Sequence, residues 1–98
     1  IDKNENLYVN EVAPRVHNSG HLTINAYNVS QFENHVRAVC NLEQIKIKKI
    51  SNAKMINLIG SQISVYRNKQ YSPNEFFFDY LKKEIKTKRK MGHLTTLV

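Results

Sequence analysis

One segment says most about the architecture of this chain: Asn10-Glu11-Val12-Ala13-Pro14-Arg15-Val16-His17-Asn18-Ser19-Gly20-His21. It gathers a carboxylate, an arginine, two histidines and two carboxamides around a proline and a glycine. A packed core has no use for this mixture, because each buried polar group left unpaired costs about 1–3 kcal/mol. The segment therefore indicates a reactive surface.

The residues around this segment predict a strand, a loop and a helix. Residues 7–12 are expected to form a strand that ends at Pro14, which lacks an amide proton, so that residues 15–21 form a loop. Ser30-Gln31-Phe32-Glu33 fits a capping box at the start of a helix that ends near Asn41. The helix carries one apolar stripe, which consists of Phe32, Val36, Val39 and Cys40. Because Cys40 belongs to this stripe, we expect it in the core.

The second half of the chain reads mainly as strands. Residues 45–48 alternate apolar and charged side chains, and residues 55–59 form a compact apolar run before Gly60. The aromatic run in residues 75–83 favours a strand, although the Lys/Glu pattern after Leu81 would also suit a helix. Residues 92–98 close the chain as a β-rich stretch.

Composition limits the class of protein. The 98 residues are 41% hydrophobic, with no transmembrane-length run and no signal-peptide pattern, so we expect a soluble protein with no membrane partner. The single cysteine excludes an internal disulfide, and we expect a cytoplasmic location.

Positive charge is concentrated in the second half. The net charge is +7, and residues 44–98 carry twelve Lys/Arg against three Asp/Glu. By composition alone this basic half could bind nucleic acid, bind an anionic metabolite or form a solvated surface.

Four sequence blocks carry a resemblance to a known family. They are the Asn10–His21 segment, the helix sequence from Ser30 to Ala38, Met55-Ile56-Asn57-Leu58-Ile59-Gly60, and Arg89-Lys90-Met91-Gly92-His93. In this order they resemble the C-terminal part of the 5-(carboxyamino)imidazole ribonucleotide synthetases, which are ATP-grasp enzymes of purine biosynthesis. The resemblance implies an ATP-dependent ligase that converts aminoimidazole ribonucleotide, bicarbonate and ATP to the carboxyamino nucleotide, ADP and phosphate through carboxyphosphate.

The resemblance also implies roles for individual residues. Glu11 matches a ligand of the magnesium ion between the ATP phosphates, with Asn10 as a neighbouring polar contact. The matches to the pocket for bicarbonate and carboxyphosphate are Arg15, His17 and Asn18, and the matches to the contacts of the substrate phosphate are Lys82, Arg89 and Lys90. Leu81 departs from the pattern, since a glycine or short polar residue is common there.

The expected fold class is α+β. Residues 1–43 would form the end of an ATP-grasp domain, with strand, active-site loop and helix, and residues 44–98 a small antiparallel β-rich domain. We expect the chain to be inactive without the N-terminal lobes of the family, whose full enzyme is expected to be a homodimer. The alternative hypothesis, an independent basic nucleic-acid-binding module, has no recognised motif in its favour.

Overall fold

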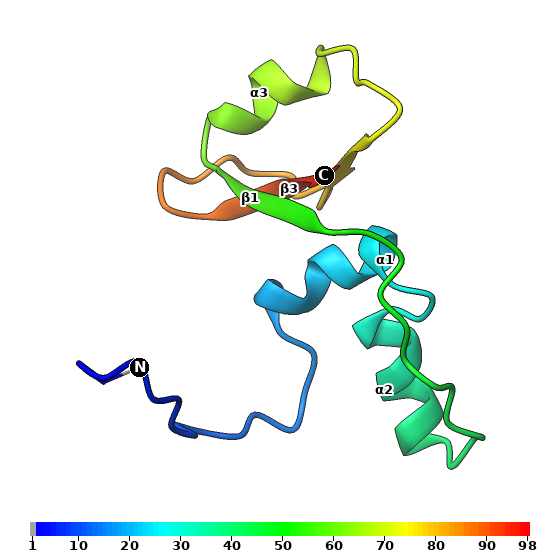
Figure 1. Ribbon diagram of the computed structural model, residues 1–98. Helices are drawn as coiled ribbons and strands as arrows, with labels where there is room; N and C mark the ends of the chain where they lie inside the picture. Colours follow the sequence, from blue (N-terminus) through cyan, green and yellow to red (C-terminus); the bar gives the residue numbers. More distant parts are fainter. Residues whose placement is uncertain (1) are drawn as a thin grey trace.

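The computed structural model describes residues 2–98 of the chain. Helical elements dominate the first half and a three-stranded sheet the second (Figure 1). The elements are η1 (Asn18–Leu22), α1 (Thr23–Ala26), α2 (Gln31–Val39), β1 (Ala53–Ile59), α3 (Gln62–Arg67), β2 (Glu75–Asp79) and β3 (Lys90–Leu97).

The sheet confirms the predicted antiparallel architecture of the C-terminal half. Its order is β1-β3-β2, with both neighbours antiparallel to the central β3. Figure 1 shows α3 on one side of this sheet and the η1–α1 segment on the other. The core on the α3 side is formed by Leu58, Ile63 and Met91, with Tyr66 and Phe77 packed against it.

A glycine in β3 allows this packing. A Cβ atom at Gly92 would lie 2.5 Å from the Phe78 carbonyl oxygen and 3.0 Å from Cδ1 of Ile63. The strand therefore accepts both its neighbour β2 and the helix α3 only because residue 92 has no side chain.

The predicted strand over 75–83 is confirmed only for Glu75–Asp79. The chain then leaves the sheet, and Leu81 adopts φ +51°. A leucine thus occupies the left-handed conformation that glycine adopts most readily.

Helix α3 follows β1 through a tight turn and was not predicted. Gly60 adopts φ +56°, and the Gln62 carboxamide oxygen accepts a hydrogen bond from the Ile59 amide at 2.8 Å. This turn reverses the chain so that Ile63 packs back onto the sheet.

Helix α2 begins and ends as predicted, but its predicted burial is wrong. The Ser30 hydroxyl oxygen accepts a hydrogen bond from the Glu33 amide at 3.1 Å, and Asn41 ends the helix region with φ +51°. Cys40 is exposed, and Val39 keeps 68% of its surface. Exposure increases along the stripe from 38% at Phe32 to 52% at Val36, so the second half of the stripe stays largely uncovered by residues 2–98.

Two further strand predictions are wrong. Residues 7–12 are irregular and exposed, and residues 45–48 contain no strand. The 46–48 segment is held instead by the Asn28 side chain, which donates to Lys46 O at 3.1 Å and accepts from Lys48 N at 2.7 Å. A strand needs a partner for its whole ladder. Near the second segment the backbone pairing is limited to the bond from Asn28 N to Lys48 O at 3.1 Å and an isolated antiparallel bridge between Tyr27 and Lys49.

None of the helices among residues 2–98 has the length and apolarity needed to cross a membrane.

Candidate functional site

The loop that precedes η1 is fixed to helix α2 by one side chain, Gln31. Its carboxamide oxygen accepts a hydrogen bond from His17 N at 2.9 Å, and its nitrogen donates to His17 O at 2.7 Å. The same nitrogen lies 2.7 Å from Nδ1 of His21. Gly20 makes room for this contact, because a Cβ atom there would collide with the Gln31 carboxamide. The expected loop is thus an ordered structure that ends in the η1 helix.

His17 caps the η1 helix. Its Nδ1 accepts a hydrogen bond from the Ser19 amide at 3.2 Å and lies 2.9 Å from the Ser19 hydroxyl. An acceptor at this position satisfies an amide that has no partner inside the helix. His17 itself is exposed, so its Nε2 side faces outward from the cap.

Asn18 connects the loop to the C-terminal sheet. Lys90 at the start of β3 donates through Nζ to the Asn18 carboxamide oxygen at 3.0 Å. The Asn18 carboxamide nitrogen donates to the Tyr80 hydroxyl at 3.5 Å. Two predicted site residues that lie 72 positions apart in the sequence are therefore in direct contact.

Lys82 lies beside this contact. Its Nζ donates to Lys90 O at 2.6 Å and lies 5.2 Å from the centre of the Tyr80 ring. Charge and ring attract each other in this arrangement. The structure thus brings Asn18, Lys82 and Lys90 together around Tyr80.

Rings from both halves of the chain line an apolar pocket of about 350 Å³ next to this cluster. Burial lowers the pKa of His93, and the nearby His21 lowers it further. Burial is also the main cause of the lowered pKa of His21, with smaller effects from Lys90 and His17. Both imidazoles are therefore neutral near pH 7. The pocket is lined by His21, Ile24, Phe32, Phe78, Tyr80 and His93.

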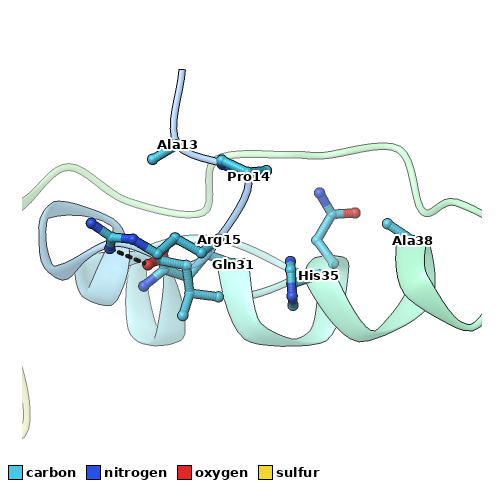
Figure 2. Close-up of a pocket in the computed structure, with 8 residues that line it drawn as sticks. Ala13, Pro14, Arg15, Gln31, His35 and Ala38 are labelled. Carbon is cyan, nitrogen blue, oxygen red and sulfur yellow. Dashed lines mark hydrogen bonds between the residues drawn. The ribbon is translucent and has the colours of Figure 1, made fainter. Parts of the chain in front are cut away.

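Arg15 lies on the other side of the loop, in a second pocket of about 310 Å³ between the loop and α2. Figure 2 shows Arg15 and Gln31 at one end of this pocket, with His35 and Ala38 on the helix toward the other end. The guanidinium donates through Nη1 to Val16 O at 3.2 Å. Arg15 is exposed and can still meet an anion.

The remaining predicted residues are separate from these contacts. Asn10 and Glu11 lie exposed on the irregular segment before Pro14, and Arg89 is exposed just before β3. No group of three metal-ligating side chains occurs among residues 2–98. Glu11 fits magnesium as a single carboxylate ligand, and the other ligands of an octahedral site would have to come from elsewhere.

Two family models match the chain. The ATP-grasp domain matches residues 2–32, and the phosphoribosylaminoimidazole carboxylase C-terminal domain matches residues 53–98. The N5-carboxyaminoimidazole ribonucleotide synthase of Staphylococcus haemolyticus is 46% identical over 99 residues, which cover 99% of this chain and 26% of that protein. The enzyme of the same name from Bacillus subtilis is 44% identical over 90 residues, covering 91% of this chain and 24% of that protein.

Solved structures agree with these matches. N5-carboxyaminoimidazole synthetase from Staphylococcus aureus complexed with ADP superposes with a TM-score of 0.89 at 43% identity, over 100% of this chain and 27% of that chain. The Aspergillus clavatus synthase in complex with ADP and 5-aminoimidazole ribonucleotide gives a TM-score of 0.78 at 33% identity, over 86% of this chain and 24% of that chain. The chain belongs to the N5-carboxyaminoimidazole ribonucleotide synthase family. It spans about a quarter of the length of the relatives it matches.

Membership in the synthase family confirms the predicted fold class, the end of an ATP-grasp domain followed by a small antiparallel domain. The two matched regions leave residues 33–52 between them, and the predicted boundary at 43/44 falls inside this interval. That boundary stays a prediction, as do the individual site residues. Nothing in the matches supports the nucleic-acid-binding alternative.

The sequence did not identify three residues that organise this part of the synthase fold: Gln31, Tyr80 and His93. From the sequence, Gln31 belongs to a helix start, Tyr80 to the aromatic run expected to form a strand, and His93 to the block that begins at Arg89, and none of the three is predicted as a site residue. The sequence held a signal for two of them. Tyr80 lies close to Lys82 in the sequence, and His93 lies close to Lys90, and both lysines were predicted as site residues.

Proposed function

We propose that the chain forms the C-terminal part of an ATP-dependent ligase of purine biosynthesis. Bicarbonate attacks the γ-phosphate of ATP, giving carboxyphosphate and ADP. The exocyclic amine of aminoimidazole ribonucleotide then takes the carboxyl group, and phosphate leaves. The observation that carries the proposal is the contact between Asn18 and Lys90, because it joins the loop block to the basic block of the family at 3.0 Å.

Named relatives support the substrates. The Staphylococcus aureus structure is described as complexed with ADP, and the Aspergillus clavatus structure as a complex with ADP and 5-aminoimidazole ribonucleotide. These describe the relatives, of which the chain matches about a quarter. The remaining parts of the reaction site would be supplied by other regions of a longer protein.

Arg15, His17 and Asn18 are proposed to bind bicarbonate and carboxyphosphate. A guanidinium offers two parallel donors to a planar carboxylate, and an imidazole and a carboxamide add donors on the same loop. Fixed donors of this kind stabilise charge that develops during phosphoryl transfer. The order imposed on the loop by Gln31 supports this role, since donors must be held in place before the reaction.

Lys82, Arg89 and Lys90 are proposed to bind the ribose phosphate of the substrate. The segment from Lys82 to Lys90 carries six basic residues and one acidic residue, Glu84, and its excess positive charge favours a dianionic ligand. The contact of Lys90 with Asn18 supports a position for the nucleotide next to the carboxyphosphate.

Glu11 is proposed as one magnesium ligand, with Asn10 as a polar neighbour of the ATP phosphates. When bound, magnesium neutralises phosphate charge during phosphoryl transfer. The exposed position of the Glu11 carboxylate leaves it accessible to a metal ion.

The cytoplasm is the proposed location, because the free thiol of Cys40 suits a reducing compartment. A homodimer is the proposed assembly of the intact protein. The uncovered apolar stripe of α2 supports its packing against a further surface of that assembly.

A chimeric enzyme tests the function. Residues 1–98 replace the matching quarter of the Staphylococcus aureus synthetase, and ADP formation is measured with and without aminoimidazole ribonucleotide and bicarbonate. We expect ADP formation that requires both. Lys90→Ala should raise the KM for the nucleotide by about tenfold or more, because a charge-assisted hydrogen bond to phosphate is worth about 1.5–3 kcal/mol.

Lys88→Ala is the matched control, since Lys88 is a neighbouring exposed lysine outside the family motifs. A chimera that folds, by circular dichroism and gel filtration, yet forms no ADP in response to the nucleotide would overturn the proposal. An equal increase in the KM for the nucleotide in Lys88→Ala and Lys90→Ala would contradict the role proposed for Lys90.

A further inference from the structure

Four side chains form a continuous hydrogen-bonded chain from the basic segment into the sheet. Lys90 Nζ lies 3.0 Å from the Asn18 carboxamide oxygen, and the Asn18 nitrogen lies 3.5 Å from the Tyr80 hydroxyl. The Tyr80 hydroxyl in turn lies 3.0 Å from Nδ1 of His93. The chain therefore connects an exposed lysine to a histidine that is only 2% exposed.

Each member of this chain donates to the next. The lysine ammonium can only donate, so the Asn18 oxygen accepts and the Asn18 nitrogen donates to Tyr80. Burial raises the pKa of the Tyr80 hydroxyl, which therefore keeps its proton. In the neutral His93 tautomer that carries its hydrogen on Nε2, Nδ1 accepts the Tyr80 proton. One direction of donation along the whole chain lets the bonds polarise one another.

His93 is a rigid end point for the chain. Its ring stacks on Phe78 with centres 5.4 Å apart and an angle of 6° between the planes. His21 packs on it at 5.3 Å. Because β3 is the central strand of the sheet, His93 cannot shift without moving both neighbouring strands.

Tyr80 contacts both Asn18 and Lys82. Its hydroxyl bonds Asn18, and its ring lies 5.2 Å from the Lys82 ammonium, which itself donates to Lys90 O. Removing the hydroxyl would free the Asn18 carboxamide to rotate and would leave the Lys82 contact with the ring in place.

We propose that Tyr80 and His93 are positioning residues, which fix the Asn18 carboxamide and through it the Lys90 ammonium. This inference rests on the proposed function, since the groups so fixed are those assigned to carboxyphosphate and substrate phosphate. Tyr80 and His93 do not touch the reacting atoms. They restrict Asn18 and Lys90 to one arrangement before substrate binds, which lowers the ordering cost of binding.

Tyr80→Phe tests the inference in two measurements. In the 98-residue chain, NMR should show that the Asn18 side-chain amide signals move and that the ring nitrogen shifts of His93 change. In the chimeric enzyme, kcat/KM for aminoimidazole ribonucleotide should fall about fivefold, the loss of one hydrogen bond. His93→Phe keeps a ring on Phe78 and removes the acceptor, so it should reproduce the movement of the Asn18 signals and the fall in kcat/KM.

Tyr71→Phe is the matched control, because the Tyr71 hydroxyl also donates a hydrogen bond, to Tyr66 O, away from the site. It should leave the Asn18 signals and kcat/KM unchanged. Unmoved Asn18 signals in Tyr80→Phe would overturn the inference whatever the activity. Equal kcat/KM in Tyr80→Phe and Tyr71→Phe would reduce Tyr80 to a structural residue. An inactive but folded wild-type chimera would refute the proposed function separately, and the Asn18 signals would still decide whether Tyr80 orders that side chain.

Discussion

Leu81 has a backbone conformation that is unfavourable for its side chain. Its φ is +51°, which lies in the left-handed region. Its side chain is 79% exposed, so removing it would cost little packing. A side chain in the left-handed region costs about 1–2 kcal/mol, while glycine loses about 0.5–1 kcal/mol more backbone entropy on folding. Leu81→Gly should therefore raise the free energy of unfolding by about 0.5–1 kcal/mol in urea denaturation.

Leu7→Gly is the control for this substitution. Leu7 is also exposed, but its φ is not positive, so glycine there relieves no strain. We expect no gain in stability from it. A loss of stability in Leu81→Gly as large as in Leu7→Gly would contradict the strain argument.

Strand β3 buries a polar group without a partner. Thr95 is fully buried, and its hydroxyl has no hydrogen bond among the described residues. Replacing such a group by an apolar one of similar shape removes the cost of its desolvation. Thr95→Val should raise the free energy of unfolding by about 1 kcal/mol, measured by urea denaturation.

The neighbouring Thr96 provides the comparison for Thr95→Val. It is only partly buried, so Thr96→Val should change the stability little. A lower free energy of unfolding in Thr95→Val would contradict the statement that the Thr95 hydroxyl is buried without a partner.

Among the helices and strands, local sequence patterns correctly predicted the elements that local interactions stabilise. The capping box of α2 and the apolar and aromatic runs of β1, β2 and β3 were readable because these signals lie within a few residues. The strands expected at 7–12 and 45–48 failed because a strand also depends on a distant partner. The candidate site divides in the same way. The motif residues could be named from the sequence. The direct contact of Lys90 with Asn18, and the position of Tyr80 beside Asn18, follow only from the fold.

The whole molecule should lose stability in mild acid. The pKa values of His21 and His93 are both lowered from 6.5 by burial, so the unfolded chain binds more protons in this range. Their contribution to stability is complete above about pH 6.5 and is lost as the pH falls through the folded-state values. Glu75 and Asp79 also have lowered pKa values, from 4.5 and 3.8, so their contributions are lost only in stronger acid.

Thermal unfolding between about pH 7.5 and pH 5 measures this effect of the histidines. We expect the Tm to fall across this range, and to fall less in His93→Asn, which cannot take up a proton at that position. His35→Asn, an exposed histidine on α2, should keep the full decrease. A Tm that stays constant from neutral pH to pH 5 in the unchanged protein would contradict the predicted linkage.

The strand order has a consequence for biosynthesis. β3 is the last of the three strands of this sheet to be translated, yet it lies between β1 and β2 and makes every strand pairing in the sheet. While the ribosome is still adding Lys90–Leu97, β1 and β2 have no ladder to join, and Ile63 and Phe77 have no Met91 to pack against. The nascent chain therefore carries β1 and β2 with open edges until β3 emerges, and during that interval these edges are exposed to aggregation.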